Sequence, residues 1–94
     1  MIRSFADRET EKVWSGLRSR HFASDIQEKA LIKLRLVNRA RMLDDLRVPP
    51  GNRLEALKGR RKGSYSIRIN DQWRICFNWH DGGAYNVEIV DYHR

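Results

Sequence analysis

Arg68 and Arg74 are the residues whose type and spacing point most directly to chemistry. Each lies in a run of alternating apolar and polar residues, on either side of a three-residue polar segment. If the two runs form a hairpin that keeps their apolar side chains together, Ile69 faces Trp73 and Arg68 faces Arg74. A guanidinium binds phosphate oxygens through a planar fork, and opposed cations repel unless an anion lies near both. The spacing therefore predicts an anion site on the polar face of the hairpin.

A third run brings the end of the chain to the same place. A five-residue loop would set Trp79 opposite Tyr85. That register places Val90 opposite Arg74 and brings Tyr92 diagonally beside it. The sequence thus predicts a polar sheet face on which the arginines and Tyr92 meet.

The net charge favours an anionic partner. The 94 residues contain 19 Lys and Arg against 12 Asp and Glu, which is a formal charge of +7. Such an excess attracts polyanions, of which nucleic acid is the commonest. Two alternatives stay open: the charge serves only solubility, and the sheet arginines are solvated side chains that Asp91 or Glu55 neutralises.

Two helices are expected before the sheet. Early carboxylates and late arginines predict a helix over Asp7–Leu17, in which Val13, Trp14 and Leu17 are buried. Ser24 and Gln27 form a capping-box pattern for a second helix. This helix should end near Leu46, before a proline-rich turn. Its buried stripe recurs at helical spacing: Ile26, Ala30, Leu34 and Val37.

Beyond that turn the apolar period changes from 3.6 to 2 residues. The runs 64–69, 73–79 and 85–90 each present one apolar face, and short polar loops join them. They predict an antiparallel meander, with Ile2–Phe5 as a candidate edge strand. The expected fold is one α+β domain over 1–94, in which two helices pack on a small sheet.

The remaining composition narrows the setting. No apolar run approaches the length of a membrane span, and the N-terminus lacks the apolar stretch of a secretory signal. The single cysteine, Cys76, cannot form an internal disulfide, so a reducing cytoplasm is expected. The three histidines and one cysteine lack metal-ligand spacing, and we expect no metal or cofactor.

The ordered motifs of the chain resemble a known family. They are the opening Met1-Ile2-Arg3-Ser4-Phe5, the segments 52–59 and 63–77, and an ending in Asp-Tyr-His after a hydrophobic strand. Together they are similar to HigB/GraT-type toxins of the RelE/ParE superfamily, which implies a RelE-like two-layer fold. The resemblance also implies a HigA-type antitoxin with a helix-turn-helix domain as partner. It further implies a free toxin that enters the ribosomal A site and cleaves mRNA there, using the RNA 2′-OH and no metal.

The resemblance implies roles for individual residues. Glu55, in an E-x-L-K pattern, would take the 2′-OH proton, although some relatives carry His there and Glu55 could instead pair with Arg53 or Lys58. Cations would stabilise the phosphorane and an acid would protonate the departing oxygen, for which an imidazole suits neutral pH. The implied catalytic set is Glu55, Lys58, Arg74, Asp91 (orienting the acid), Tyr92 (near the phosphate or stacked on a base) and His93 (the acid). The implied RNA and rRNA contacts are Arg53, Arg60, Arg61, Lys62 and Arg68.

Two other functions compete with this reading. ParE-type members of the superfamily poison DNA gyrase, but a gyrase poison needs no acid–base pair. GraT-like toxins are mild, so a weakly catalytic or non-catalytic module that binds rRNA and disturbs ribosome assembly is the second alternative.

Overall fold

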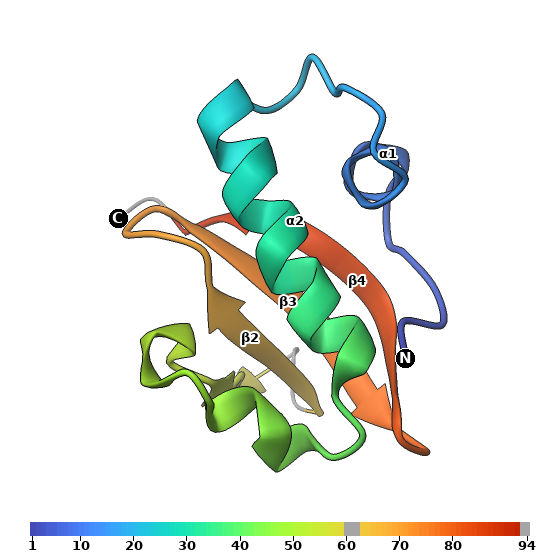
Figure 1. The fold of residues 1–94 in the computed structure, drawn as a ribbon. Coiled ribbons are helices and arrows are strands. Elements are labelled where there is room, and N and C mark those ends of the chain that lie inside the picture. Colours follow the sequence, from blue (N-terminus) through green and yellow to red (C-terminus); the bar gives the residue numbers. More distant parts are fainter. Residues whose placement is uncertain (60–62, 93–94) are drawn as a thin grey trace.

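The computed structural model describes residues 1–59 and 63–92 as an α+β fold in two layers (Figure 1). Two helices, α1 (Arg8–Trp14) and α2 (Ser24–Arg39), cover one face of a four-stranded sheet. Its antiparallel strands lie in the order β1-β2-β3-β4. The strands are β1 (Glu55–Ala56), β2 (Ser64–Arg68), β3 (Trp73–His80) and β4 (Gly83–Asp91), and two 3-10 turns, η1 (Leu43–Arg47) and η2 (Pro50–Asn52), precede them. The expected fold class is confirmed.

Helix α1 is shorter than the predicted Asp7–Leu17. Asp7 caps its start, where the carboxylate accepts the Thr10 N–H at 2.7 Å. The helix ends at Trp14 because Gly16 takes a left-handed φ of 79°. Leu17 therefore leaves the buried stripe and is 61% exposed, which corrects the expectation that it is buried.

Helix α2 buries the predicted stripe, since all four of its apolar residues are in the core. The predicted capping box is wrong, because Ala23 is the N-cap and Ser24 already lies inside the helix. The Ser24 hydroxyl accepts a hydrogen bond from Arg18, while the Gln27 amide binds the backbone of the preceding loop. The helix also stops at Arg39, well before the expected end near residue 46.

The turn after α2 explains this early stop. The Asp45 carboxylate accepts the backbone N–H groups of Arg41 and Met42 at 2.9 and 3.1 Å. Such side-chain acceptors compete with helical hydrogen bonds and favour a turn. The chain therefore leaves the helix and enters η1, where Leu46 is buried.

The sheet register confirms the first hairpin and corrects the second. Arg68 lies opposite Arg74, as predicted. The second hairpin has a two-residue turn, in which Asp81 and Gly82 both have positive φ, instead of the expected five-residue loop. Trp79 consequently pairs with Ala84 and not with Tyr85.

A β-bulge restores the expected pairing further along β4. Between the pairs Cys76–Glu88 and Asn78–Tyr85, β3 contributes one residue and β4 contributes two. The bulge offsets the error in the loop, so Val90 still lies opposite Arg74.

The sheet edges differ from the expectation. The predicted edge strand at Ile2–Phe5 forms only two isolated parallel bridges, from Ile2 to Ala84 and from Phe5 to Val87. The other edge is β1, a two-residue strand that the alternation did not predict and that pairs Glu55 with Ser66. Two residues are too few to show a period of 2. None of the helices in the described ranges has the length and apolar character that a membrane crossing requires.

Candidate active site

A polar cavity of about 300 Å³ lies where β1, the β2–β3 turn and the end of β4 meet. Glu55 pairs with Ser66, and Arg68 pairs with Arg74, so these side chains lie on the same face of the sheet. That face points away from the helices, and the cavity therefore lies on the open face of the sheet. Its lining is Arg53, Glu55, Arg68, Asn70, Asp71, Arg74 and Tyr92. Five of the residues expected in the site are therefore brought together.

Arg74 forms the floor of this cavity and is only 8% exposed. Its Nε donates to the Ser66 hydroxyl at 2.8 Å, and its Nη2 donates to the Arg53 carbonyl at 2.6 Å. Its Nη1 lies 3.9 Å from a Glu55 carboxylate oxygen. A buried guanidinium needs such partners, because an unpaired charge in the interior is costly. The Arg74 Nη1 group points toward the side of the cavity on which Glu55 lies, where it can also bind an anionic ligand.

Tyr92 closes the cavity from the end of the chain. Its backbone N–H donates to the Gln72 carbonyl at 2.6 Å, which ties the residue after β4 to the β2–β3 turn. The guanidinium carbon of Arg74 lies 5.8 Å from the centroid of its ring, within cation–π range. The predicted meeting of Arg74 and Tyr92 on one face is confirmed.

The loop before β1 is held from behind by Asn52, which is fully buried. Its side-chain N–H groups donate to the Leu46 and Val48 carbonyls, and its oxygen accepts from the Lys33 ammonium of α2 at 2.6 Å. Burial, and secondarily the nearby Arg68 charge, lowers the pKa of Lys33. Asn52 thereby fixes the position of Arg53, whose carbonyl binds Arg74.

Two carboxylates that line the cavity partly neutralise the positive charge of its arginines. Glu55 is more than half exposed and extends into solvent, so a bound nucleotide can reach its oxygens. Arg68 is ion-paired with Asp71, a partner that the expectation of repelling arginines overlooked. The opposition of Arg68 and Arg74 is thus relieved partly within the protein itself.

Several predicted site residues are not brought into the cavity. Lys58 is exposed on the segment after β1 and is not part of the lining. Asp91 lies opposite Trp73, which directs it to the helix-covered face, and it accepts a hydrogen bond from Gln72 at 3.2 Å. The remaining predictions, for Arg60, Arg61, Lys62 and His93, fall on positions outside the described residues.

Sequence reasoning missed three residues that build this site. Asn70 and Asp71 line the cavity, although the sequence pattern predicts only a connecting loop there. Ser66 orients Arg74, and its place on the polar face, two residues before Arg68, was the available signal. Within the described part of the chain, no group of three or more His, Cys, Asp or Glu is placed to hold a metal ion.

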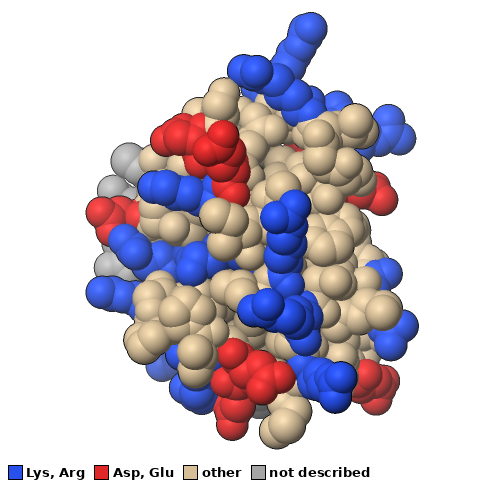
Figure 2. Space-filling model, viewed as in Figure 1, with Lys and Arg blue, Asp and Glu red and all other residues tan. Residues whose placement is uncertain are grey.

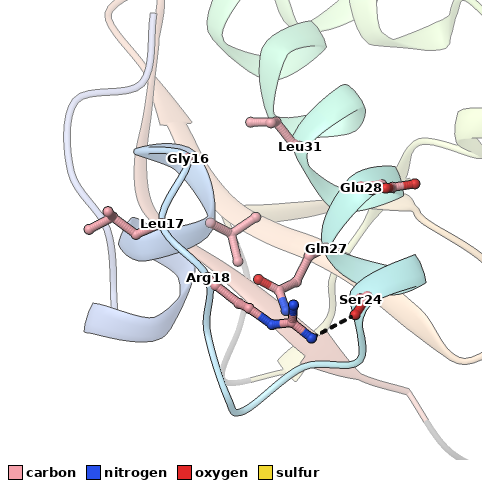
Figure 3. A pocket seen from close by; sticks show the side chains of 8 residues that line it. Gly16, Leu17, Arg18, Ser24, Gln27, Glu28 and Leu31 are labelled. Atoms are coloured by element: carbon pink, nitrogen blue, oxygen red, sulfur yellow. Dashed lines mark hydrogen bonds between the residues drawn. The ribbon is translucent and has the colours of Figure 1, made fainter.

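A separate hollow lies between α1 and α2, in the helix layer of the molecule and away from this cavity (Figure 3). Leu17, Leu31 and Val13 contribute apolar surface, and the Arg18 guanidinium donates to the Ser24 hydroxyl across its rim. Figure 2 shows that Lys and Arg also spread over this helix-bearing face, with acidic patches among them. Positive charge is therefore not confined to the cavity, and the cavity is distinguished instead by its buried arginine.

Comparisons with known proteins identify related toxins. A family model for the "RelE-like toxin of type II toxin-antitoxin system HigB" matches residues 3–93. Toxin HigB-1 of Vibrio cholerae is 40% identical over 90 residues, which cover 95% of both chains. Endoribonuclease HigB of Proteus vulgaris is 44% identical over 41 residues, covering 44% of this chain and 45% of that protein.

Solved structures share the fold at low sequence identity. The YoeB–YefM complex from Staphylococcus aureus contains a chain with a TM-score of 0.63 and 17% identity, and the match covers 100% of this chain and 99% of that chain. YafQ from E. coli strain BL21(DE3) has a TM-score of 0.58 and 16% identity, with 97% and 93% covered. The fold of this chain is thus similar to the folds of these solved structures. The chain therefore belongs to the HigB family of RelE-like toxins of type II toxin–antitoxin systems.

Proposed function

We propose that this toxin is a ribosome-dependent endoribonuclease that cleaves mRNA in the ribosomal A site. The observation that carries the proposal is the buried Arg74, held beside Glu55 and Tyr92 in a cavity on the open sheet face. A fixed cation next to an accessible carboxylate suits phosphoryl chemistry, because charge develops on the phosphorane while a proton leaves the nucleophile. The name of the Proteus vulgaris relative, an endoribonuclease, supports the same activity.

In the proposed reaction the ribose 2′-oxygen attacks the adjacent phosphorus while the bond from phosphorus to the 5′-oxygen breaks. Glu55 accepts the 2′-OH proton, and Arg74 stabilises the charge on the non-bridging oxygens. A proton passes to the departing 5′-oxygen from the acid, a role that we assign to His93 on sequence grounds. The products are a 2′,3′-cyclic phosphate and a 5′-hydroxyl, so atoms and charge balance without any further reagent.

The surrounding residues complete the proposal. Arg68 and Arg53 would bind neighbouring phosphates, and Lys58 would add positive charge beside the cavity. Tyr92 would stack on a base or contact the scissile phosphate. The basic stretch 60–62 would contact rRNA, where binding depends on charge more than on sequence.

The proposed partners follow from the same function. The toxin would act in the cytoplasm, where it enters the A site of a ribosome that carries mRNA. A HigA-type antitoxin with a helix-turn-helix domain would restrain it. We expect the ribosome to orient the message and so supply part of the rate.

One experiment separates this function from its competitors. The toxin is expressed in growing cells, and mRNA 5′ ends, ribosomal subunit profiles and DNA breaks are measured together. New mRNA ends at a fixed position within codons support the proposal. Accumulation of ribosomal subunits without such ends indicates a non-catalytic rRNA-binding toxin, and gyrase-linked DNA breaks indicate a gyrase poison.

A chemical substitution in the message tests the attacking group. A ribosome-bound mRNA with a single 2′-deoxyribose at the cut position should resist cleavage there, because the nucleophile is missing. Cleavage at that position at the normal rate contradicts the proposed reaction.

A further inference from the structure

A second cavity, of about 290 Å³, lies on the open face of the sheet beside the candidate active site. Ser64 of β2, Asn78 of β3 and Asn86 of β4 contribute its polar lining. Cys76 also lines it, and the Cys76 sulfur lies 3.9 Å from the hydroxyl oxygen of Tyr92. The two cavities therefore adjoin along β3.

A chain of hydrogen bonds orients the amides in this second cavity. The Asn86 Nδ2 donates to the Asn78 Oδ1 at 3.0 Å, and the Asn78 Nδ2 donates to the Ser64 hydroxyl at 2.7 Å. Within residues 1–59 and 63–92, the Asn86 Oδ1 and the Ser64 hydroxyl proton have no further partner. The Asn86 Oδ1 and the Ser64 hydroxyl thus provide an oriented acceptor and an oriented donor at the two ends of this hydrogen-bonded chain.

The bulge in β4 is what places the Asn86 amide there. Asn86 has a left-handed φ of 52°, which asparagine tolerates better than most residues. Its N–H leaves the ladder and donates to the Ser4 hydroxyl at 2.9 Å. A bulge changes the direction in which a side chain points, compared with the direction that regular strand pairing would give it.

The charges of the two cavities differ. The candidate active site contains three arginines, whereas none of the described residues that line the second cavity is Lys or Arg. Glu88 adds a carboxylate to that lining. Among the lining residues that the structure describes, none is a cation that could bind a phosphate, whereas the edge of a nucleobase presents donors and acceptors that match amides and hydroxyls.

We propose that the second cavity binds the nucleobase of a nucleotide adjacent to the scissile phosphate, an inference that rests on the proposed ribonuclease function. The Asn86 Oδ1 accepts a hydrogen bond from an exocyclic amino group, and the Ser64 hydroxyl donates one to a ring nitrogen or carbonyl of the same base. Uracil has no exocyclic amino group. The cavity therefore favours an amino-bearing base over uracil at that position.

The test compares Asn86→Gly with Asp81→Gly. Glycine accepts a positive φ without strain, so Asn86→Gly removes the amide and keeps the backbone. Asp81, whose φ is 51°, lies in the turn between β3 and β4, outside both cavities, and provides the matched control. Single-turnover cleavage is measured on ribosomes carrying mRNAs that differ only in the base on the 5′ or the 3′ side of the cut.

We expect the unmodified toxin and Asp81→Gly to prefer amino-bearing bases over uracil on one of the two sides by about fivefold, the effect of one hydrogen bond. In Asn86→Gly this preference should fall to near one, while cleavage itself persists. Ser64→Ala should lower the preference in the same direction, and it serves as the second variant if Asn86→Gly melts early.

Two results overturn this inference in distinguishable ways. If the unmodified toxin has no base preference on either side, or if both variants retain it, the second cavity does not bind a base. If the unmodified toxin cuts no ribosome-bound message, the ribonuclease proposal fails and this inference fails with it.

Discussion

The guanidinium of Arg74 lies over the ring of Tyr92, with 5.8 Å between the guanidinium carbon and the ring centroid. This contact joins the middle of the sheet to the last described residue of the chain. It places a buried cation beside an aromatic surface, a pairing that serves both a phosphate and a base of single-stranded RNA.

The ring of Tyr92 should matter more than its hydroxyl. Tyr92→Phe keeps the ring over Arg74, whereas Tyr92→Leu removes a contact worth about 0.5–1 kcal/mol at a partly exposed site. We expect Tyr92→Leu to cleave ribosome-bound mRNA at least about tenfold more slowly, because it loses base stacking as well. Equal rates for the two variants in a single-turnover assay would show that the ring is not used.

Ser66 should act through Arg74. Ser66→Ala removes the acceptor for Arg74 Nε, a hydrogen bond to a charged group and thus worth about 1.5–3 kcal/mol. Urea unfolding should show a lower midpoint, and cleavage at saturating toxin should slow. The control is Ser15→Ala, at an exposed position outside the cavity. The assignment is contradicted if Ser66→Ala lowers stability and leaves the cleavage rate unchanged.

Asn52→Ala should destabilise the loop that carries Arg53. The substitution leaves the Leu46 carbonyl without its partner in a buried place, and the Val48 carbonyl and the Lys33 ammonium without theirs in partly buried places. We expect the free energy of unfolding to fall by about 2–4 kcal/mol, as for other disrupted buried networks. Chemical denaturation measures the loss, and a change below about 0.5 kcal/mol would show that the loop is held by other contacts.

Acid should weaken the turn after α2. The backbone N–H groups of Met42 and Arg41 lower the pKa of Asp45, so its carboxylate stabilises the folded state when ionised. That stabilisation is complete above the ordinary carboxyl pKa of 3.8 and is lost as the pH falls through the lower folded value. Asp45→Asn should melt earlier than the unmodified protein at neutral pH, and the difference should narrow in strong acid. A gap that is constant with pH would contradict this role.

The sequence could predict those parts of the site that depend on the alternation of apolar and polar residues in the strands. Alternation in β2 and β3 was enough to pair Arg68 with Arg74, because a register slip of one residue would expose the apolar face. The loop before Tyr85 is shorter than its composition predicts, since the positive φ of Asp81 permits a two-residue turn. Only the bulge at Asn86 corrected the pairing, and its stabilising contact comes from Ser4, far away in the sequence.

Features that depend on distant partners were beyond sequence reasoning. The tether from Lys33 to Asn52 joins α2 to a loop 19 residues later, and no periodicity announces it. The burial of Arg74 was likewise hidden, because a charged residue on a polar face is ordinarily exposed. The resemblance implies that Asp91 belongs to the site together with Tyr92, although neighbours in a strand point to opposite faces.

The central claim is that the Arg74 guanidinium stabilises the phosphorane during mRNA cleavage. Arg74→Lys tests it most directly, since lysine keeps the charge and loses the planar fork. The measurement is the single-turnover rate on a programmed ribosome, with toxin binding to the ribosome and thermal melting followed in parallel. We predict a rate about 10²–10³-fold lower with ribosome binding nearly unchanged. A folded Arg74→Lys variant that cleaves at the full rate would contradict the claim.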